Sequence, residues 1–158
     1  MTFRKKLDKV LEYFLSFLMG AMVLNVVWQV ASRFIFSDPS SFTDELARFL
    51  LIWIGLLGSA YASGKHLHLG VAILETKLSI ANKKKLGVFI NVLILLFAVT
   101  ALVVGGCMLV YISFRLGQTS SALKLPLGVV YTVVPLSGLL ITFYSISDLI
   151  HPPVKTHE

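Results

Sequence analysis

The sequence predicts an all-α integral membrane protein with four transmembrane helices, and two observations support this. Charged residues make up only 14% of the 158-residue chain, whereas soluble domains carry about 25%. Too few polar groups therefore remain to cover a soluble surface. Four long apolar runs also fill most of the chain, and each has or nearly has the about 20 residues that cross a bilayer. These runs are residues 11–35, 46–62, 86–114 and 129–150.

The distribution of charge predicts how these helices are oriented. The net charge of +6 does not indicate a nucleic-acid partner, because the basic residues stand at the ends of the apolar runs and form no stripe. Most of them lie in the N-terminal segment, in the joint between the second and third runs, and in the tail, which predicts that these segments are cytoplasmic. We expect one domain over residues 1–158 that crosses the membrane several times, with both termini inside.

The first helix is expected over residues 10–36 and the second over residues 42–63. The N-terminal residues are basic like the start of a signal peptide, but the apolar run is too long and no cleavage site follows, so we expect a retained helix. The sequence Asp-Pro-Ser-Ser at 38–41 ends it. Ser41 and Asp44 have the spacing of a capping box at the start of the second helix. Asp44 and Glu45 also suit the positive end of its dipole.

The long joint after the second helix is expected to contain a short interfacial helix within residues 67–82. Apolar residues recur there at helical spacing, as in helices that lie along a membrane surface. The alternative is a plain loop. The basic run that follows is a candidate for contact with phospholipid headgroups. It consists of Lys83, Lys84 and Lys85.

The third and fourth helices are expected over residues 86–115 and 128–150. Gly105 and Gly106 either allow close approach of a neighbouring helix or form a flexible spot. In the fourth helix, Pro135 removes one backbone hydrogen bond and should kink the helix.

No pattern in the sequence indicates catalysis or a bound metal. The histidines His66, His68, His151 and His157 stand at helix ends or in the tail, so none can ligate a haem inside a bundle. Nucleophile motifs, phosphate loops and cysteine pairs are absent, and Cys107 suits a small apolar packing residue. We therefore expect no enzyme activity, no cofactor and no metal.

Ionisable residues at membrane depth are candidates for function, and here they gather at the ends of the first two helices. They are Arg33, Asp44, Glu45 and Arg48. Asp44 and Glu45 precede Arg48 by four and three residues, so both can face it across one helical turn. We expect a structural ion-pair cluster that binds the first helix to the second. A proton or cation relay is the alternative, although a relay usually needs an acid deeper in the span.

Other residues within the spans are candidates for a subunit interface. Asn25 and Gln29 lie four apart on the first helix, and their amides either link neighbouring helices by hydrogen bonds or face a partner protein. Trp53 lies inside its span, away from the interfacial belt where tryptophan is usual. The remaining candidates are Gly55, Gly58 and Pro135.

Residues 42–60 resemble the second helix of the small membrane subunit of tripartite ATP-independent periplasmic (TRAP) transporters. The family pattern is an acidic pair, Glu-Leu-Ala-Arg, a tryptophan, spaced glycines and a basic-His ending, which Lys65 and His66 supply here. Residues 25–36 and 122–138 are similar to the end of the family's first helix and to the entry of its fourth. One departure is that Ser63 and Gly64 replace an arginine-rich end of the second helix.

This resemblance implies that the chain lies in a bacterial inner membrane, as one part of a transporter that imports an organic acid of the C4-dicarboxylate or sialic acid class. A periplasmic substrate-binding protein captures the solute, and a large membrane subunit carries it inward with sodium. The small subunit forms a heterodimer with the large one and acts as scaffold, without a substrate or sodium site. The external joints, residues 37–41 and 116–125, would be the places that meet the binding protein.

Two other classes of function stay open from the sequence. The first is a stand-alone small multidrug-type exporter, which needs an acid in mid-membrane on its first helix, whereas Glu12 stands at the cytoplasmic end. The second is a membrane anchor of a redox complex, which a haem absorbance would reveal.

Overall fold

The computed structural model describes residues 2–35, 40–65 and 80–150, and the side chains of residues 4–35, 40–65 and 86–150. All of its regular elements are helices. They are α1 (Thr2–Ile35), α2 (Ser41–Gly64), α4 (Ile80–Phe97), the π-helix η1 (Ala98–Gly105), α5 (Gly106–Arg115), α6 (Leu127–Tyr131) and α7 (Val133–Ile150).

Four of the helical segments are long and apolar enough to cross a membrane, as the sequence predicts. They are Arg4–Ile35, Ser41–Gly64, Leu86–Arg115 and Leu127–Ile150. The expected interfacial segment falls almost entirely on residues 66–79, which lie outside the described part of the chain. Only its last three residues, 80–82, are described, and they belong to α4.

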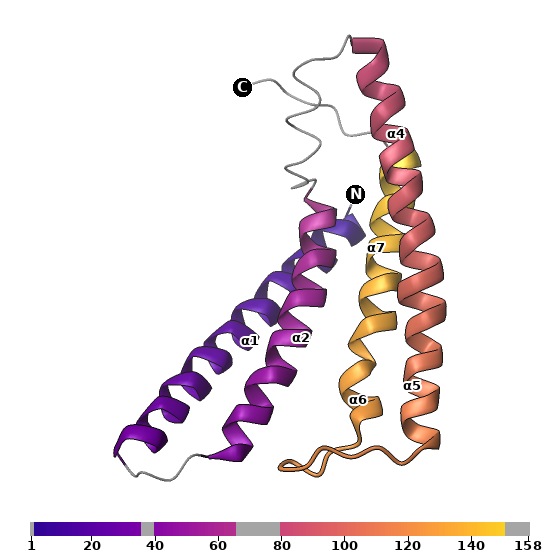
Figure 1. The fold of residues 1–158 in the computed structure, drawn as a ribbon. Coiled ribbons are helices and arrows are strands. Elements are labelled where there is room, and N and C mark those ends of the chain that lie inside the picture. The colour runs from indigo at the N-terminus through magenta and orange to yellow at the C-terminus, as the bar shows by residue number, and fades with distance from the viewer. Residues whose placement is uncertain (1, 36–39, 66–79, 151–158) are drawn as a thin grey trace.

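The helices stand in a row in the order α1, α2, α7 and the continuous rod of α4, η1 and α5 (Figure 1). At one end of the row lie Ile35, Ser41, Arg115 and Leu127, and we call this the loop end. At the other, the terminal end, α1 begins and α7 finishes. Toward the loop end α1 leans away from α7 (Figure 1).

The first helix is longer than its apolar run suggests, because α1 begins at Thr2 rather than near residue 10. The added residues are mostly lysine, arginine and leucine, which favour helix. The start of α2 also differs from the sequence prediction by one residue. Ser40, not Ser41, is the N-cap, and its Oγ accepts a hydrogen bond from the Thr43 N–H at 3.4 Å.

Glycines allow the rod of α4, η1 and α5 to approach α7 closely. A Cβ at Gly106 would lie 2.9 Å from both Cδ and N of Pro135, and a Cβ at Gly138 would lie 2.7 Å from Cβ of Leu102. The close approach predicted at the glycine pair is therefore confirmed for Gly106. It does not involve Gly105, where a Cβ would meet only the Thr100 oxygen at 3.7 Å.

The fourth span is interrupted where Pro135 predicts a distortion. Pro135 has no N–H to donate to the carbonyl of residue 131, and the α-helix breaks at Thr132, between α6 and α7. The ladder resumes with the Leu136 N–H donating to the Thr132 oxygen at 3.2 Å. The sequence did not predict the π-helix in the third span. This segment packs on α7.

Candidate functional site

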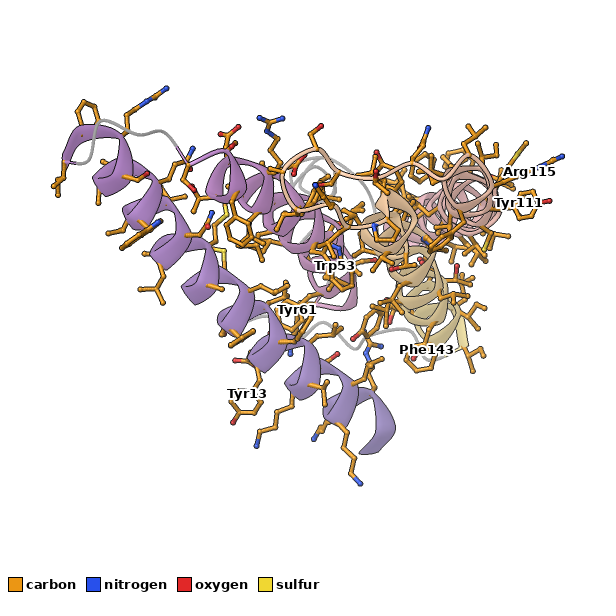
Figure 2. All side chains as sticks on the ribbon, turned by 90° about the horizontal axis from the view of Figure 1, so that it is seen from below. Tyr13, Trp53, Tyr61, Tyr111, Arg115 and Phe143 are labelled. Atoms are coloured by element: carbon orange, nitrogen blue, oxygen red, sulfur yellow. The ribbon has the colours of Figure 1, made fainter. Side chains whose placement is uncertain are left out.

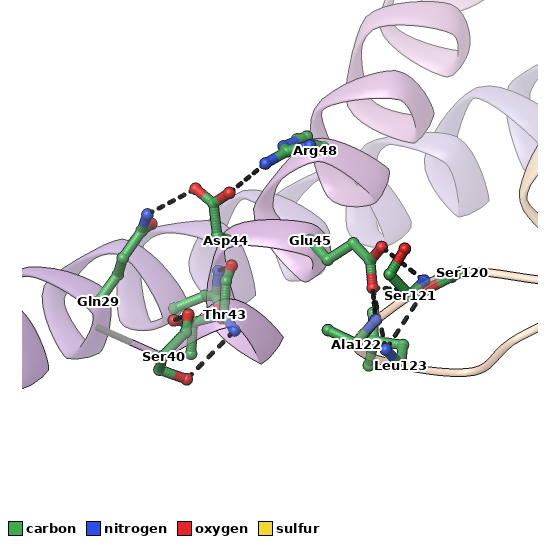
Figure 3. Close-up of polar contacts among 11 residues, drawn as sticks. Gln29, Ser40, Thr43, Asp44, Glu45, Arg48, Ser120, Ser121, Ala122 and Leu123 are labelled. Carbon is green, nitrogen blue, oxygen red and sulfur yellow. Dashed lines mark hydrogen bonds and ion pairs between the residues drawn. The ribbon is translucent and has the colours of Figure 1, made fainter. Parts of the chain in front are cut away.

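Two amide side chains connect α1 to the first turn of α2 at the loop end. Asn25 is 9% exposed, and its Nδ2 donates to the Thr43 carbonyl at 2.8 Å. One turn further, Gln29 Nε2 donates to Asp44 Oδ1 at 3.0 Å (Figure 3). Both amides thus link two helices of this chain, which is one of the two roles that the sequence leaves open.

Asp44 and Arg48 form the ion pair expected from their spacing. The pair is exposed, with 70% of the Arg48 side chain and 48% of the Asp44 side chain accessible. The four-residue cluster expected from the sequence does not form, because neither Arg33 nor Glu45 is paired with these two residues in the described structure. Arg33 is exposed on the last turn of α1.

Glu45 instead binds the loop between α5 and α6, more than 70 residues away in sequence (Figure 3). Its carboxylate accepts a hydrogen bond from the Ser120 hydroxyl. It also accepts from the backbone N–H groups of Ser121, Ala122 and Leu123 at 3.0, 2.8 and 2.9 Å. Successive N–H groups turned toward one point make a concave anion site, and here the anion is a side chain of the same protein.

The terminal end contains a second polar cluster, which sequence reasoning missed. Arg4 of α1 pairs with Asp148 of α7 at 2.7 Å, and its other nitrogen donates to the Gly64 carbonyl of α2 at 2.6 Å. One turn along α1, Asp8 accepts from the Tyr144 hydroxyl at 2.6 Å and lies 3.5 Å from Lys65 Nζ. We call these five side chains the terminal latch, because they join α1, α2 and α7.

The sequence does carry a signal for the terminal latch. Arg4 and Asp8 are four residues apart, as are Tyr144 and Asp148, so each pair lies on one helix face. With both termini on one side of the membrane, the two faces stand at the same level. The sequence prediction treated Arg4 as an orientation signal alone and assigned no role to the other three.

The subunit-interface candidates occupy different environments. Trp53 lies between α2 and α6, where its Nε1 donates to the Val130 carbonyl at 3.1 Å (Figure 2). Pro135 packs on Gly106. Gly55 and Gly58, unlike Trp53 and Pro135, have open space beside them, because a Cβ at either position would meet no atom within 4 Å.

Four of the five carboxylates among the described residues have a partner within the chain. Asp8, Asp44, Glu45 and Asp148 each have a partner inside the chain, while Glu12 is exposed near the terminal end. The described part of the chain contains no group of three or more His, Cys, Asp or Glu residues that could hold a metal ion. The four histidines and the side chains of Lys83, Lys84 and Lys85 lie outside it.

Comparison with known proteins gives a consistent set of relatives. Residues 22–152 match the family described as "Tripartite ATP-independent periplasmic transporters, DctQ component". A Haemophilus influenzae protein that is named as a small permease protein of a TRAP transporter is 28% identical over 146 residues, which are 91% of this chain and 88% of that protein.

Two further relatives carry a solute in their names. The Vibrio cholerae sialic acid TRAP transporter small permease protein SiaQ is 32% identical over 75 residues, or 48% of this chain and 43% of that protein. The Halomonas elongata ectoine TRAP transporter small permease protein TeaB is 29% identical over 126 residues, or 77% of this chain and 62% of that protein. The matched region thus spans less than two thirds of both.

Proposed function

The chain belongs to the family of the DctQ component of tripartite ATP-independent periplasmic transporters, and from this premise we propose that it is a scaffold for the large membrane subunit. In this proposal the two subunits form a heterodimer in the inner membrane. The large subunit imports an organic acid together with sodium, and a soluble binding protein delivers the acid. The small subunit contributes no substrate or ion site of its own.

The observation that carries this proposal is the contrast between the polar and apolar groups of the chain. Most described carboxylates already have partners within the chain, so they are not available to bind a solute. The apolar surface, in contrast, is largely uncovered: only 6% of the most apolar window of the third span is buried. Its exposed residues include Phe89, Leu96, Phe97, Val104 and Met108.

Lipid and a partner subunit can share this apolar surface. Helices associate in lipid through close packing and a few polar links, and small residues favour such contacts. Gly55 and Gly58 lie three residues apart on α2 with open space beside them. We assign these two glycines to the contact with the large subunit. The other candidates stabilise the arrangement of the helices behind that surface, and they are Asn25, Gln29, Trp53 and Pro135.

The proposed orientation places both termini in the cytoplasm and the loop end in the periplasm. The excess of lysine and arginine in the N-terminal segment and in the joint before α4 supports it. Lys83, Lys84 and Lys85 then stand at the inner membrane surface, where anionic headgroups attract basic residues. The loop end faces the compartment of the binding protein, so the small subunit can assist docking.

We propose a class of solute, the organic acids, and not the single solute that any one relative carries in its name. The named relatives include a sialic acid protein, a C4-dicarboxylate protein and an ectoine protein. Sialic acid and C4-dicarboxylates are organic acids, and we propose a solute of that class. Uptake of a panel of labelled acids by the whole transporter distinguishes among them.

Affinity purification tests the scaffold role. A tag on this chain should retain the large membrane subunit in detergent at a one-to-one ratio, and removal of this chain should abolish uptake by the remaining components. A chain that is stable and monodisperse alone, and whose removal leaves uptake intact, contradicts the proposal.

A further inference from the structure

Many hydroxyl side chains in the helices of this chain donate to a carbonyl of their own helix. Serine and threonine in membrane helices often do this, because the bond satisfies the hydroxyl without water. Ser137 of α7 is 0% exposed, and its Oγ donates to the Val134 carbonyl at 2.8 Å. The same kind of bond is made by Ser16, Ser32, Ser59 and Thr100.

Two other hydroxyls of α7 differ from this pattern. The hydroxyl oxygens of Thr142 and Ser145 are buried, and neither has a hydrogen-bond partner in the described part of the chain. Ser145 is 2% exposed. Leaving a buried hydroxyl without a hydrogen bond is unfavourable, and such groups in native proteins are nearly always paired with protein or with ordered water.

Both hydroxyls lie on the face of α7 that packs on the third span. Gly138, Thr142 and Ser145 are four and three residues apart, so they share one helix face. A Cβ at Gly138 would lie 2.7 Å from Cβ of Leu102, and Asn91 Nδ2 of α4 donates to the Ser145 carbonyl at 3.1 Å. Thr142 therefore lies at a level between these two contacts.

The spacing of the two hydroxyls suits a single bridging molecule. Side chains three residues apart on a helix have Cβ atoms about 5–6 Å from each other. Two O–H···O bonds of about 2.8 Å each, joined at one oxygen atom, cover a similar distance. A buried water also needs several polar groups around it, and the amide of Asn91 is a further polar group beside Ser145.

We propose that Thr142 and Ser145 bind one water molecule between α7 and α4, and that this water links the third span to the fourth beside the hydrogen bond of Asn91. Helices in lipid associate through close packing and a few polar links, and a bridging water serves as such a link. This inference is independent of the proposed function.

Water suits this site better than a cation or a lipid headgroup. Both hydroxyls are neutral, and a cation taken out of water needs a charge partner. The acid one turn further along α7, Asp148, is paired with Arg4 at 2.7 Å. A headgroup stays at the membrane surface, whereas these two hydroxyl oxygens are buried within the protein.

The test is a double-mutant cycle on the full-length chain, unfolded in detergent micelles with increasing dodecyl sulfate. Thr142→Val keeps the shape of the side chain and removes the hydroxyl, as does Ser145→Ala with the smaller residue. Each should lower the equilibrium constant for folding about fivefold, because the water loses one of its bonds. The double variant should lose no more than either single variant, since both depend on the same water.

The matched control is Ser137→Ala, which removes a buried hydroxyl of the same helix that already has a partner in its own helix. It should not lower the equilibrium constant, because alanine favours helix more than serine does. An equal loss in this control overturns the inference. So does unchanged or increased stability of Thr142→Val or Ser145→Ala, which is the result for a hydroxyl without any partner, or a double variant in which the two losses multiply.

Two further measurements identify the bound molecule. In deuterated detergent, nuclear Overhauser spectra of the wild-type chain should contain a cross-peak between water and the Thr142 methyl group, and Ser145→Ala should remove it. Absence of this cross-peak in the wild type, or its persistence in the variant, contradicts a shared water. Replacing sodium chloride by potassium chloride at equal concentration should leave the unfolding midpoint unchanged, and a higher midpoint in sodium would assign the site to a cation instead.

Discussion

Replacing Gly106 with alanine tests the close contact between the third and fourth spans. The new Cβ would lie 2.9 Å from Cδ and from N of Pro135, and 3.0 Å from Cγ1 of Val134. Two of these atoms belong to the proline ring and its backbone, which cannot rotate away as a flexible side chain can. Either α5 or α7 must therefore shift.

Two opposing effects set the size of the change. Forcing an extra carbon into a packed interior typically costs about 1–3 kcal/mol. Glycine inside a helix is less favourable than alanine by about 0.5–1 kcal/mol. The difference, between about 0 and 2.5 kcal/mol, predicts that Gly106→Ala lowers the free energy of unfolding by about 1 kcal/mol at the middle of that range.

The neighbouring glycine provides a matched control. At Gly105 a new Cβ would meet only the Thr100 oxygen at 3.7 Å, an ordinary contact. Gly105→Ala should therefore leave stability unchanged or raise it by up to about 1 kcal/mol. Unfolding in detergent micelles with increasing dodecyl sulfate, followed by tryptophan fluorescence, measures both variants. Equal stability of the two variants would refute the helix contact described at Gly106.

Further substitutions test the other contacts, and the same unfolding measurement serves for the first three. Arg4→Ala should lower the free energy of unfolding by about 1–3 kcal/mol, because Asp148 and the Gly64 carbonyl lose the guanidinium that donates to them. Wild-type stability of this variant would refute a role for the terminal latch. Trp53→Phe should lower the free energy of unfolding by about 1 kcal/mol, because it removes the hydrogen bond to α6. An unchanged free energy of unfolding would argue against that bond. Arg48→Ala should change stability by less than about 1 kcal/mol, because exposed ion pairs contribute little; a larger loss would mean that Asp44 is less accessible than described. Gly58→Leu should leave the isolated chain as stable as before but lower the yield of complex on affinity purification, and full yield would remove this glycine from the proposed interface.

The small effect expected at Arg48 differs from what the sequence alone suggests. Acids and arginines at the end of a membrane helix favour a buried cluster, whose disruption costs about 3–5 kcal/mol. The structure exposes the Asp44–Arg48 pair and turns Glu45 to another element. Spacing along a helix identifies which side chains can meet across a turn, but not which of them a distant loop will bind.

The four spans could be predicted because they depend on local hydrophobicity, which a continuous window of sequence contains. The capping serine and the distortion near Pro135 were predicted to within a few residues, because each depends on the chemistry of side chains adjacent in sequence. The hydrogen bond of Asn25 to α2 was one of two expected roles of this amide.

Contacts between distant parts of the chain were not predictable in the same way. The loop between α5 and α6 closes around Glu45 only after α2, α5 and α6 are placed beside one another. The terminal latch needs both ends of the described chain together, and Arg4 and Asp148 are 144 positions apart in sequence. Such contacts depend on the arrangement of the helices, which hydrophobic patterning does not specify.

Uptake by reconstituted vesicles tests the central claim most directly. Three preparations are compared: the large subunit with this chain, the large subunit alone, and this chain alone, each with binding protein and a sodium gradient. The account predicts solute accumulation only in the first preparation. Accumulation driven by this chain alone, or undiminished accumulation without it, would contradict the proposal that it supports the large subunit and carries nothing itself.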